Sequence, residues 1–184
     1  DRAQTDELTG VHSRRHLLEE APRMLARLRA RGQRSAVMML DLDHFKRIND
    51  EHGHRAGDLV LRRAAQAMRK AMRADSLLAR YGGEEFCAIV PVDDEDDATR
   101  AAERIRATLS RLALSIDQRP LRLSVSIGLA VQRGDLRFDE LLAIADEGVY
   151  LAKERGRDCV IAPGSSPEIS RPARPRAAPR VRHA

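Results

Sequence analysis

Two glycines followed by two glutamates, Gly82-Gly83-Glu84-Glu85, separate two apolar runs near the middle of the chain. A Gly-Gly pair between strand-like runs predicts a two-residue hairpin, because a type I′ turn needs positive φ at both central residues. Consecutive side chains on a strand point to opposite faces, so Glu84 and Glu85 are expected to differ in role. A tight turn beside two solvated acids explains these residues equally well, and other acids and cations must decide between the two interpretations.

A second pair of acids, Asp41 and Asp43, follows the apolar run 36–40, which is typical of a strand covered on both faces. Acids at the end of a buried strand suit Mg²⁺, which takes oxygen ligands and often shares them with substrate phosphates. The N–H groups of residues 44–46 and the ammonium group of Lys46 would suit a polyphosphate. Read alone, Asp-Leu-Asp is more simply explained as an ordinary strand end.

Two further cations, Lys153 and Arg157, flank the end of a predicted helix over residues 138–155. A cation in the last turn interacts favourably with the helix dipole, and for these residues alone that structural role is the favoured interpretation. No G-x-x-x-x-G-K-[ST] motif is present, so a Walker-type phosphate loop is excluded.

The elements that must position these residues follow from apolar periodicity. A helix is expected over 13–31, capped by Ser13, with a kink or restart at Pro22 because proline costs roughly 3 kcal/mol in a helix interior. The other expected elements are a loop at 51–58, a helix to about residue 72, the hairpin 77–90, a helix after Asp93 or Asp94, a strand over 121–131, the helix 138–155 closed by Gly156, and a short strand at 159–161. That order predicts an α+β or α/β sandwich with helices on a mainly antiparallel sheet.

Composition disfavours nucleic acid as a partner. The 184 residues suit one domain, and the net charge of +5 comes mostly from the segment 163–184, so the remainder is nearly neutral. Aromatic residues make up 3% of the chain and tryptophan is absent, which leaves few platforms for stacking bases.

The sequence also indicates the cellular location of the protein and the nature of its two terminal segments. Cys87 and Cys159 lie far apart in apolar runs, which predicts reduced core residues of a cytoplasmic protein. No signal peptide or membrane-length apolar run occurs. Residues 1–5 are interpreted as the end of a connector from an upstream domain, and the Pro/Arg/Ala-rich segment 163–184 as a disordered tail.

Over about residues 6–162 the chain resembles the GGDEF family of diguanylate cyclases. The resemblance rests on five motifs in order, which are highly specific together. They are Asp6-Glu7-Leu8-Thr9-Gly10; Asp41-Leu42-Asp43-His44-Phe45-Lys46-Arg47-Ile48-Asn49-Asp50 with Gly53-His54 and Gly57-Asp58; Arg80-Tyr81-Gly82-Gly83-Glu84-Glu85-Phe86; Ser124-Val125-Ser126-Ile127-Gly128; and Ala145-Asp146 with Tyr150, Ala152-Lys153 and Gly156-Arg157.

The resemblance implies a catalytic domain at 6–162 with the sheet-and-helix fold shared with nucleotide cyclases and polymerase palms. Its activity would be the condensation of two GTP into cyclic di-GMP and two pyrophosphates. Each domain would hold one GTP, so catalysis requires a homodimer, which is weak for an isolated domain. An upstream sensory or receiver domain is expected, since this family is usually fused to one.

The resemblance also implies the site residues. Asp41, the Leu42 carbonyl and Glu84 would hold two Mg²⁺ or Mn²⁺ ions, and Glu85 would be a further metal-associated acid that helps to deprotonate the 3′-hydroxyl. The implied phosphate contacts are His44, Phe45, Lys46, Lys153 and Arg157, and the implied guanine contacts are Asn49 and Asp58. A carboxylate such as Asp58 accepts from guanine N1–H and the 2-amino group, which adenine lacks.

The sequence departs from the family pattern at its product-inhibition site, which reads Arg-x-x-Asp. Arg73 is in place, Ser76 replaces the aspartate, and Arg104 is a candidate secondary contact. Weakened product inhibition is therefore expected. Asp158 and Ser13 stand where the family usually has asparagine, and Gly148 costs about 1 kcal/mol relative to alanine in a helix.

An alternative function is a non-catalytic GGDEF domain that binds GTP or cyclic di-GMP as a regulatory module. Loss of metal or phosphate residues would favour that alternative. Asp41, Lys46, Glu84 and Glu85 are all present, so the enzyme is the favoured interpretation.

Overall fold

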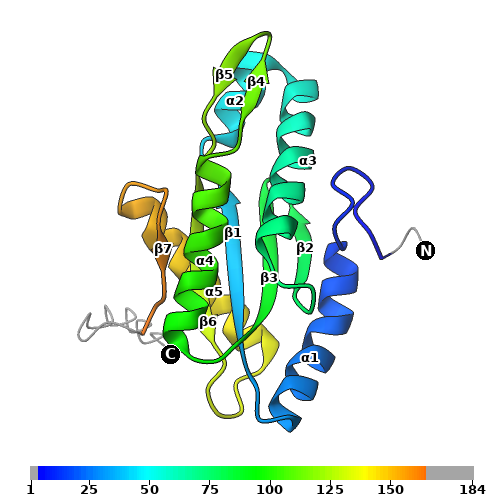
Figure 1. The fold of residues 1–184 in the computed structure, drawn as a ribbon, viewed down its shortest axis with the longest axis vertical. Coiled ribbons are helices and arrows are strands. Elements are labelled where there is room, and N and C mark those ends of the chain that lie inside the picture. The colour runs from blue at the N-terminus through cyan, green and yellow to red at the C-terminus, as the bar shows by residue number, and fades with distance from the viewer. Residues whose placement is uncertain (1–3, 165–184) are drawn as a thin grey trace, which may run out of the picture.

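The computed structural model describes residues 4–164 (Figure 1). The predicted tail therefore lies almost wholly outside the described residues, as do the first three residues of the predicted connector. Among residues 4–164, no helix combines the length and the apolar character that a membrane crossing requires.

Five helices and a five-stranded sheet make up the described chain. The helices are α1 (Arg14–Ala30), α2 (Phe45–His52), α3 (His54–Ala71), α4 (Glu95–Ser110) and α5 (Phe138–Glu154). The sheet strands are β1 (Arg34–Leu42), β2 (Leu77–Gly82), β3 (Glu85–Val92), β6 (Val125–Val131) and β7 (Val160–Ile161). A separate two-stranded sheet consists of β4 (Leu114–Ile116) and β5 (Arg119–Leu121).

The sheet has the strand order β2-β3-β1-β6-β7. β1 pairs antiparallel with β3 and with β6, β2 pairs antiparallel with β3, and the short β7 pairs parallel with β6. The predicted α+β fold with a mainly antiparallel sheet is therefore confirmed.

β1 lies at the centre of the sheet with both faces covered. Met38 and Leu40 point into a core shared with α2, α3 and α4, whereas Val37 and Met39 point into a second core shared with α1 and α5. Figure 1 shows α3 and α4 in front of the sheet, with β1 running behind them. A continuous apolar run suits such a strand, because neither face meets water.

α1 begins where expected, since the Ser13 hydroxyl accepts a hydrogen bond from the His16 N–H. The predicted restart at Pro22 is wrong, because one helix continues through that residue. Burial of an apolar side chain contributes about 1.5–3 kcal/mol, and several such side chains of α1 pack on the sheet. These side chains are Leu17, Met24, Leu25 and Leu28. Their burial offsets the free energy lost with the hydrogen bond that proline removes.

Two other expected boundaries are wrong. The segment 51–58 is nearly all helical, because α2 and α3 are separated by Gly53 alone, at φ 81°. The expected strand 121–131 is divided, since Leu121 ends β5 and Val125 begins β6. Between them, the Ser124 carbonyl accepts a hydrogen bond from the Asp43 N–H, so this segment turns to meet the end of β1.

α5 approaches the sheet closely through two glycines. A Cβ atom on Gly148 would lie 2.7 Å from the Cα of Gly128 and 2.8 Å from the Ile161 carbonyl oxygen. The helix-propensity cost expected at Gly148 thus accompanies a backbone contact that no side chain permits. This contact places the C-terminal half of α5 beside the end of β1.

Cys87 is buried in the core as predicted, whereas Cys159 is only half-buried. Burial raises the pKa of the Cys87 thiol.

Candidate active site

The predicted hairpin is present, but its turn is displaced by one residue. β2 ends at Gly82, which pairs with Glu85, so Gly83 and Glu84 form the two-residue turn. Gly83 has φ 50°, and Gly82 is not among the glycines with positive φ. The displacement follows from an irregularity between Arg80 and Gly82 in the pairing of β2 with β3. Positive φ at both glycines was therefore a wrong expectation, and Glu84 lies in the turn and not on a strand.

The end of β1 brings the two acidic motifs together. Asp41 pairs with Glu85 in the register of β1 and β3, and the Leu42 N–H donates to the Glu84 carbonyl oxygen at 3.3 Å. Residues that are more than forty positions apart in the sequence thus share one end of the sheet. Asp41, Leu42, Glu84 and Glu85 are brought together as the resemblance implied.

α5 adds a cation to this cluster of acids. Lys153 Nζ lies 2.7 Å from Asp41 Oδ2. The helix-dipole interpretation, favoured from sequence alone, accounts for only part of the environment of Lys153, since its ammonium group also forms a tertiary ion pair.

Two acids of this cluster, Asp41 and Glu85, have raised pKa values. Burial raises the pKa of Asp41, the Lys153 ammonium group opposes that rise, and the Glu84 and Asp43 carboxylates add to it. Burial also raises the pKa of Glu85, followed in effect by the negative charges of Asp41 and Asp146. Gathering negative charge at a partly buried site favours the binding of a cation.

The donor set fits a magnesium or manganese site that is completed by substrate. Among residues 4–164, no three acidic, histidine or cysteine side chains converge into a complete metal cage. Mg²⁺ commonly uses one or two carboxylates and takes its other ligands from water and substrate phosphates. Asp41 and Glu84, together with the backbone carbonyl of Leu42 at the end of β1, match that pattern of oxygen donors.

Asp43 has a different role from Asp41. Its carboxylate accepts hydrogen bonds from the hydroxyls of Ser124 at 2.8 Å and Ser126 at 2.7 Å, and from the Asp158 N–H at 3.1 Å. Asp43 is also almost fully buried. Its oxygens are therefore used to join the end of β1 to β6 and to the loop after α5.

Three of the implied phosphate contacts, His44, Phe45 and Lys46, lie at the start of α2. His44 is the N-cap residue, with φ 57° and no side-chain capping bond, and Phe45 and Lys46 are the first helical residues. The N–H groups of residues 44–46, which were expected in a turn, lie at the N-terminus of a helix. Unpaired N–H groups at such a position attract anions. Lys46 and Arg157 are exposed, as contacts to a ligand require.

The implied guanine contacts come from α2 and α3. Asn49 and Asp58 are both half-buried. A Cβ atom on Gly57 would overlap the side-chain oxygen of Asn49 and would lie 3.1 Å from the Phe45 ring. Gly57 therefore provides the space that the Asn49 amide occupies.

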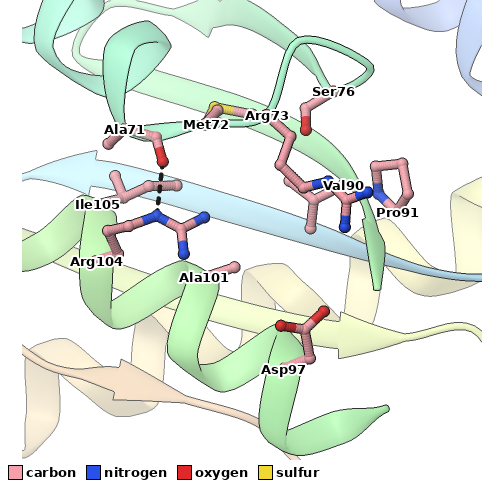
Figure 2. Close-up of a pocket in the computed structure, with 10 residues that line it drawn as sticks. All are labelled: Ala71, Met72, Arg73, Ser76, Val90, Pro91, Asp97, Ala101, Arg104 and Ile105. Atoms are coloured by element: carbon pink, nitrogen blue, oxygen red, sulfur yellow. Dashed lines mark hydrogen bonds between the residues drawn. The ribbon is translucent and has the colours of Figure 1, made fainter. Parts of the chain in front are cut away.

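The residues predicted to form a degenerate product site line a separate cavity of about 420 Å³ (Figure 2). Figure 2 shows Arg73 and Ser76 on the segment after α3, with Arg104 facing them from α4. Arg104 Nε donates to the Ala71 carbonyl at 2.8 Å, and Arg73 Nε lies 3.5 Å from the Asp75 carboxylate. The Ser76 hydroxyl oxygen is buried without a hydrogen-bond partner in the described part of the chain.

Sequence reasoning missed two features of these sites. Asp97 lines the same cavity from α4, although its sequence context suggested only a helix start. Arg80 joins two motifs: its Nε donates to the Gly83 carbonyl at 2.9 Å, and its Nη1 lies 3.4 Å from the Asp6 carboxylate. The presence of Asp6 and Arg80 in separate motifs was the available signal, but only the fold shows their contact.

Comparisons with known proteins agree with this geometry. A family model described as "Diguanylate cyclase, GGDEF domain" matches residues 3–159. Response regulator PleD of Caulobacter vibrioides is 41% identical over 162 residues, which cover 86% of this chain and 36% of PleD. Diguanylate cyclase DgcP of Pseudomonas aeruginosa is 37% identical over 157 residues, covering 85% of this chain and 23% of DgcP. The chain thus spans little more than a third of the first relative and under a quarter of the second.

Solved structures give the same result. The GGDEF domain of DgcB from Caulobacter crescentus, in complex with c-di-GMP, matches with a TM-score of 0.83 and 32% identity over 88% of this chain and 96% of that one. Diguanylate cyclase SiaD from Pseudomonas aeruginosa, in complex with its activator SiaC, matches with a TM-score of 0.81 and 35% identity over 86% of this chain and 61% of that one.

Proposed function

Because the chain belongs to the GGDEF family of diguanylate cyclases, we propose that it condenses two GTP molecules into cyclic di-GMP and two pyrophosphates. The observation that carries this proposal is the meeting of Asp41, the Glu84–Glu85 pair and Lys153 at one end of β1. An acidic cluster beside a cation and a helix N-terminus provides separate contacts for metal ions and for a triphosphate.

In the proposal, Asp41, the Leu42 carbonyl and Glu84 hold two Mg²⁺ or Mn²⁺ ions in each active site. When bound, such ions neutralise charge on the triphosphate and lower the pKa of an attacking hydroxyl. Glu85 stands beside them as the acceptor of the 3′-hydroxyl proton. Its raised pKa suits that role, because a general base works best when its pKa approaches the working pH.

The substrate is oriented by residues on both sides of this cluster. The N–H groups of residues 44–46, together with Lys46, Lys153 and Arg157, bind the β- and γ-phosphates in this proposal. Asn49 and Asp58 bind the guanine edge. Lys153 exchanges part of its contact with Asp41 for a phosphate oxygen when GTP enters, which leaves Asp41 free to accept a metal ion.

Catalysis requires two copies of the domain. Each site holds one GTP, and the 3′-oxygen of one GTP attacks the α-phosphorus of the other, so the active form is a homodimer with the two sites facing each other. The proposal also places the domain in the cytoplasm, under the control of an upstream sensory or receiver domain.

Feedback by cyclic di-GMP is weakened in this proposal. Ser76 occupies the position of the family's aspartate, and a hydroxyl cannot accept both guanine N1–H and the 2-amino group as a carboxylate does. Arg73 and Arg104 still line the cavity, so residual binding is expected.

One assay tests the proposed activity. The chain is incubated at high concentration with GTP and Mg²⁺, because the dimer is weak, and the products are separated by chromatography. Cyclic di-GMP and pyrophosphate in a ratio of one to two are expected. GTP binding without cyclic di-GMP formation would favour the alternative, a regulatory module that binds nucleotide without converting it.

A further inference from the structure

The loop after α5 has an unusual backbone. Gly156, Arg157 and Asp158 have φ values of 103°, 69° and 46°. Glycine adopts positive φ readily and aspartate does so more often than most residues, but arginine seldom does, so the conformation of Arg157 depends on the contacts around it. Within the loop, the Arg157 N–H donates to the Ala152 carbonyl at 2.9 Å and closes the helix end.

Asp158 is held from two sides. Its N–H donates to the Asp43 carboxylate at 3.1 Å, and its own carboxylate accepts a hydrogen bond from Arg106 Nη1 at 2.8 Å. Arg106 lies on α4, where its Nε is also bound by Glu103 at 2.8 Å. The loop is thus hydrogen-bonded to the end of β1 on one side and to α4 on the other.

The backbone of Arg157 is held at the helix end by its N–H bond to the Ala152 carbonyl, whereas its side chain is not held in the same way. Its side chain is exposed and makes no hydrogen bond or ion pair with the rest of residues 4–164. The direction of its guanidinium group is therefore set by the backbone on either side of it. Asp158 is the neighbouring residue whose tertiary contacts define that backbone.

We infer that Arg106 and Asp158 are positioning residues for Arg157, and that their ion pair aims the Arg157 guanidinium at the nucleotide phosphates. This inference rests on the proposed function, which places Arg157 at the β- and γ-phosphates. The residue after Arg157 is an aspartate in this chain, so its contact with Arg106 is an ion pair. A charge-assisted hydrogen bond holds the loop more firmly than an amide would.

Binding of an unreactive substrate tests the inference. The 184-residue chain is titrated calorimetrically, in Mg²⁺, with 3′-deoxy-GTP, which lacks the attacking hydroxyl. Arg106→Gln is expected to weaken binding about fivefold, within the range for a partly exposed ion pair. Asp158→Asn keeps the N–H donor to Asp43 and a neutral acceptor for Arg106, so about a twofold loss is expected.

A double-mutant cycle separates positioning from general damage. In an Arg157→Ala background, Arg106→Gln is expected to have no further effect on affinity, because the group that it positions is gone. Arg100→Gln is the matched control: Arg100 is also on α4, but within residues 4–164 its ion pairs are with Asp94 and Asp97 near the start of that helix. The affinity of Arg100→Gln for 3′-deoxy-GTP is expected to equal that of the unmodified chain.

The outcomes are distinct. An equal loss with and without the Arg157 side chain, or no loss in Arg106→Gln, overturns the inference and leaves the proposed function intact. Failure of the unmodified chain to bind 3′-deoxy-GTP overturns both. Thermal unfolding of each variant identifies misfolding, and Asp158→Asn, which changes no volume, supplies the test if Arg106→Gln unfolds.

Discussion

Lys153 Nζ lies 2.7 Å from Asp41 Oδ2, although the two residues are 112 positions apart in the sequence. The ammonium group comes from the last turn of α5 and the carboxylate from the end of β1. This ion pair joins the helix that carries one proposed phosphate contact, Lys153, to the strand that carries two proposed metal ligands, Asp41 and Leu42.

Removal of either acid proposed to bind metal should abolish turnover and preserve the fold. Asp41→Ala and Glu84→Ala are each expected to lower cyclic di-GMP formation by at least about a hundredfold, because the triphosphate charge is then poorly neutralised. Product chromatography measures the loss, and circular dichroism checks the fold. The control is Asp117→Asn, at an exposed turn position with φ 49° that asparagine also tolerates. Retention of full activity by either alanine variant would contradict the proposed site.

Asp41→Asn should stabilise the metal-free chain at neutral pH. The folded-state pKa of Asp41 is raised, so its ionised form is less favourable in the folded chain than in the unfolded chain. The penalty is present when pH exceeds the raised pKa and disappears as pH falls below it. The Tm of Asp41→Asn should therefore exceed that of the unmodified chain at pH 7, and the difference should shrink as the solution is acidified. A difference that grows on acidification would show that the sign is wrong.

Ser76→Asp should strengthen inhibition by the product. A carboxylate at this position is expected to lower the inhibitory concentration of cyclic di-GMP about tenfold, as for a charged hydrogen bond gained. Initial rates at increasing cyclic di-GMP measure the effect. Ser76→Asn is the matched control, since asparagine has nearly the same volume as aspartate but carries no charge. An unchanged inhibitory concentration in Ser76→Asp would remove the interpretation of Ser76 as a lost feedback residue.

Gly57→Ala should weaken GTP binding through Asn49. The added Cβ atom must displace the Asn49 side chain, so the KM for GTP is expected to rise about tenfold with a smaller change in kcat. Steady-state kinetics measures both constants. In an Asn49→Ala background the same substitution should have little further effect, because its target is absent. Additive losses in that background would mean that Gly57 acts on another group.

Gly148→Ala should destabilise the chain in spite of the better helix propensity of alanine. Its Cβ atom would meet the backbone of Gly128 and Ile161, which cannot rotate away, and overpacking of this kind costs about 1–3 kcal/mol. Urea unfolding should show a lower free energy of unfolding, and activity should fall because Lys153 is carried on the same helix. An increase of about 1 kcal/mol in the free energy of unfolding, which helix propensity alone would give, would contradict the close packing of α5 on β6.

The arrangement of the site could be predicted only in part from local patterns. The motifs identified Asp41, Glu84, Lys153 and Arg157 as candidates, and apolar periodicity located most helices and strands. The exact turn was missed because an irregularity in strand pairing moved it from Gly82-Gly83 to Gly83 and Glu84. The β4–β5 hairpin was missed because its turn uses Asp117 and Gln118 at positive φ, where no glycine marks the position.

The sequence by itself determined the family, the α+β class and the side chains available for chemistry, because residue types, motif order and apolar period are local properties. Only the tertiary structure decided what those side chains do. It distinguished Asp41, at the proposed metal site, from Asp43. The Asp43 carboxylate accepts hydrogen bonds from Ser124, Ser126 and the Asp158 N–H. It also paired Asp41 with Lys153 through strand register and the close approach of Gly148 to Gly128. Such contacts join distant segments, so they depend on packing that no local pattern contains.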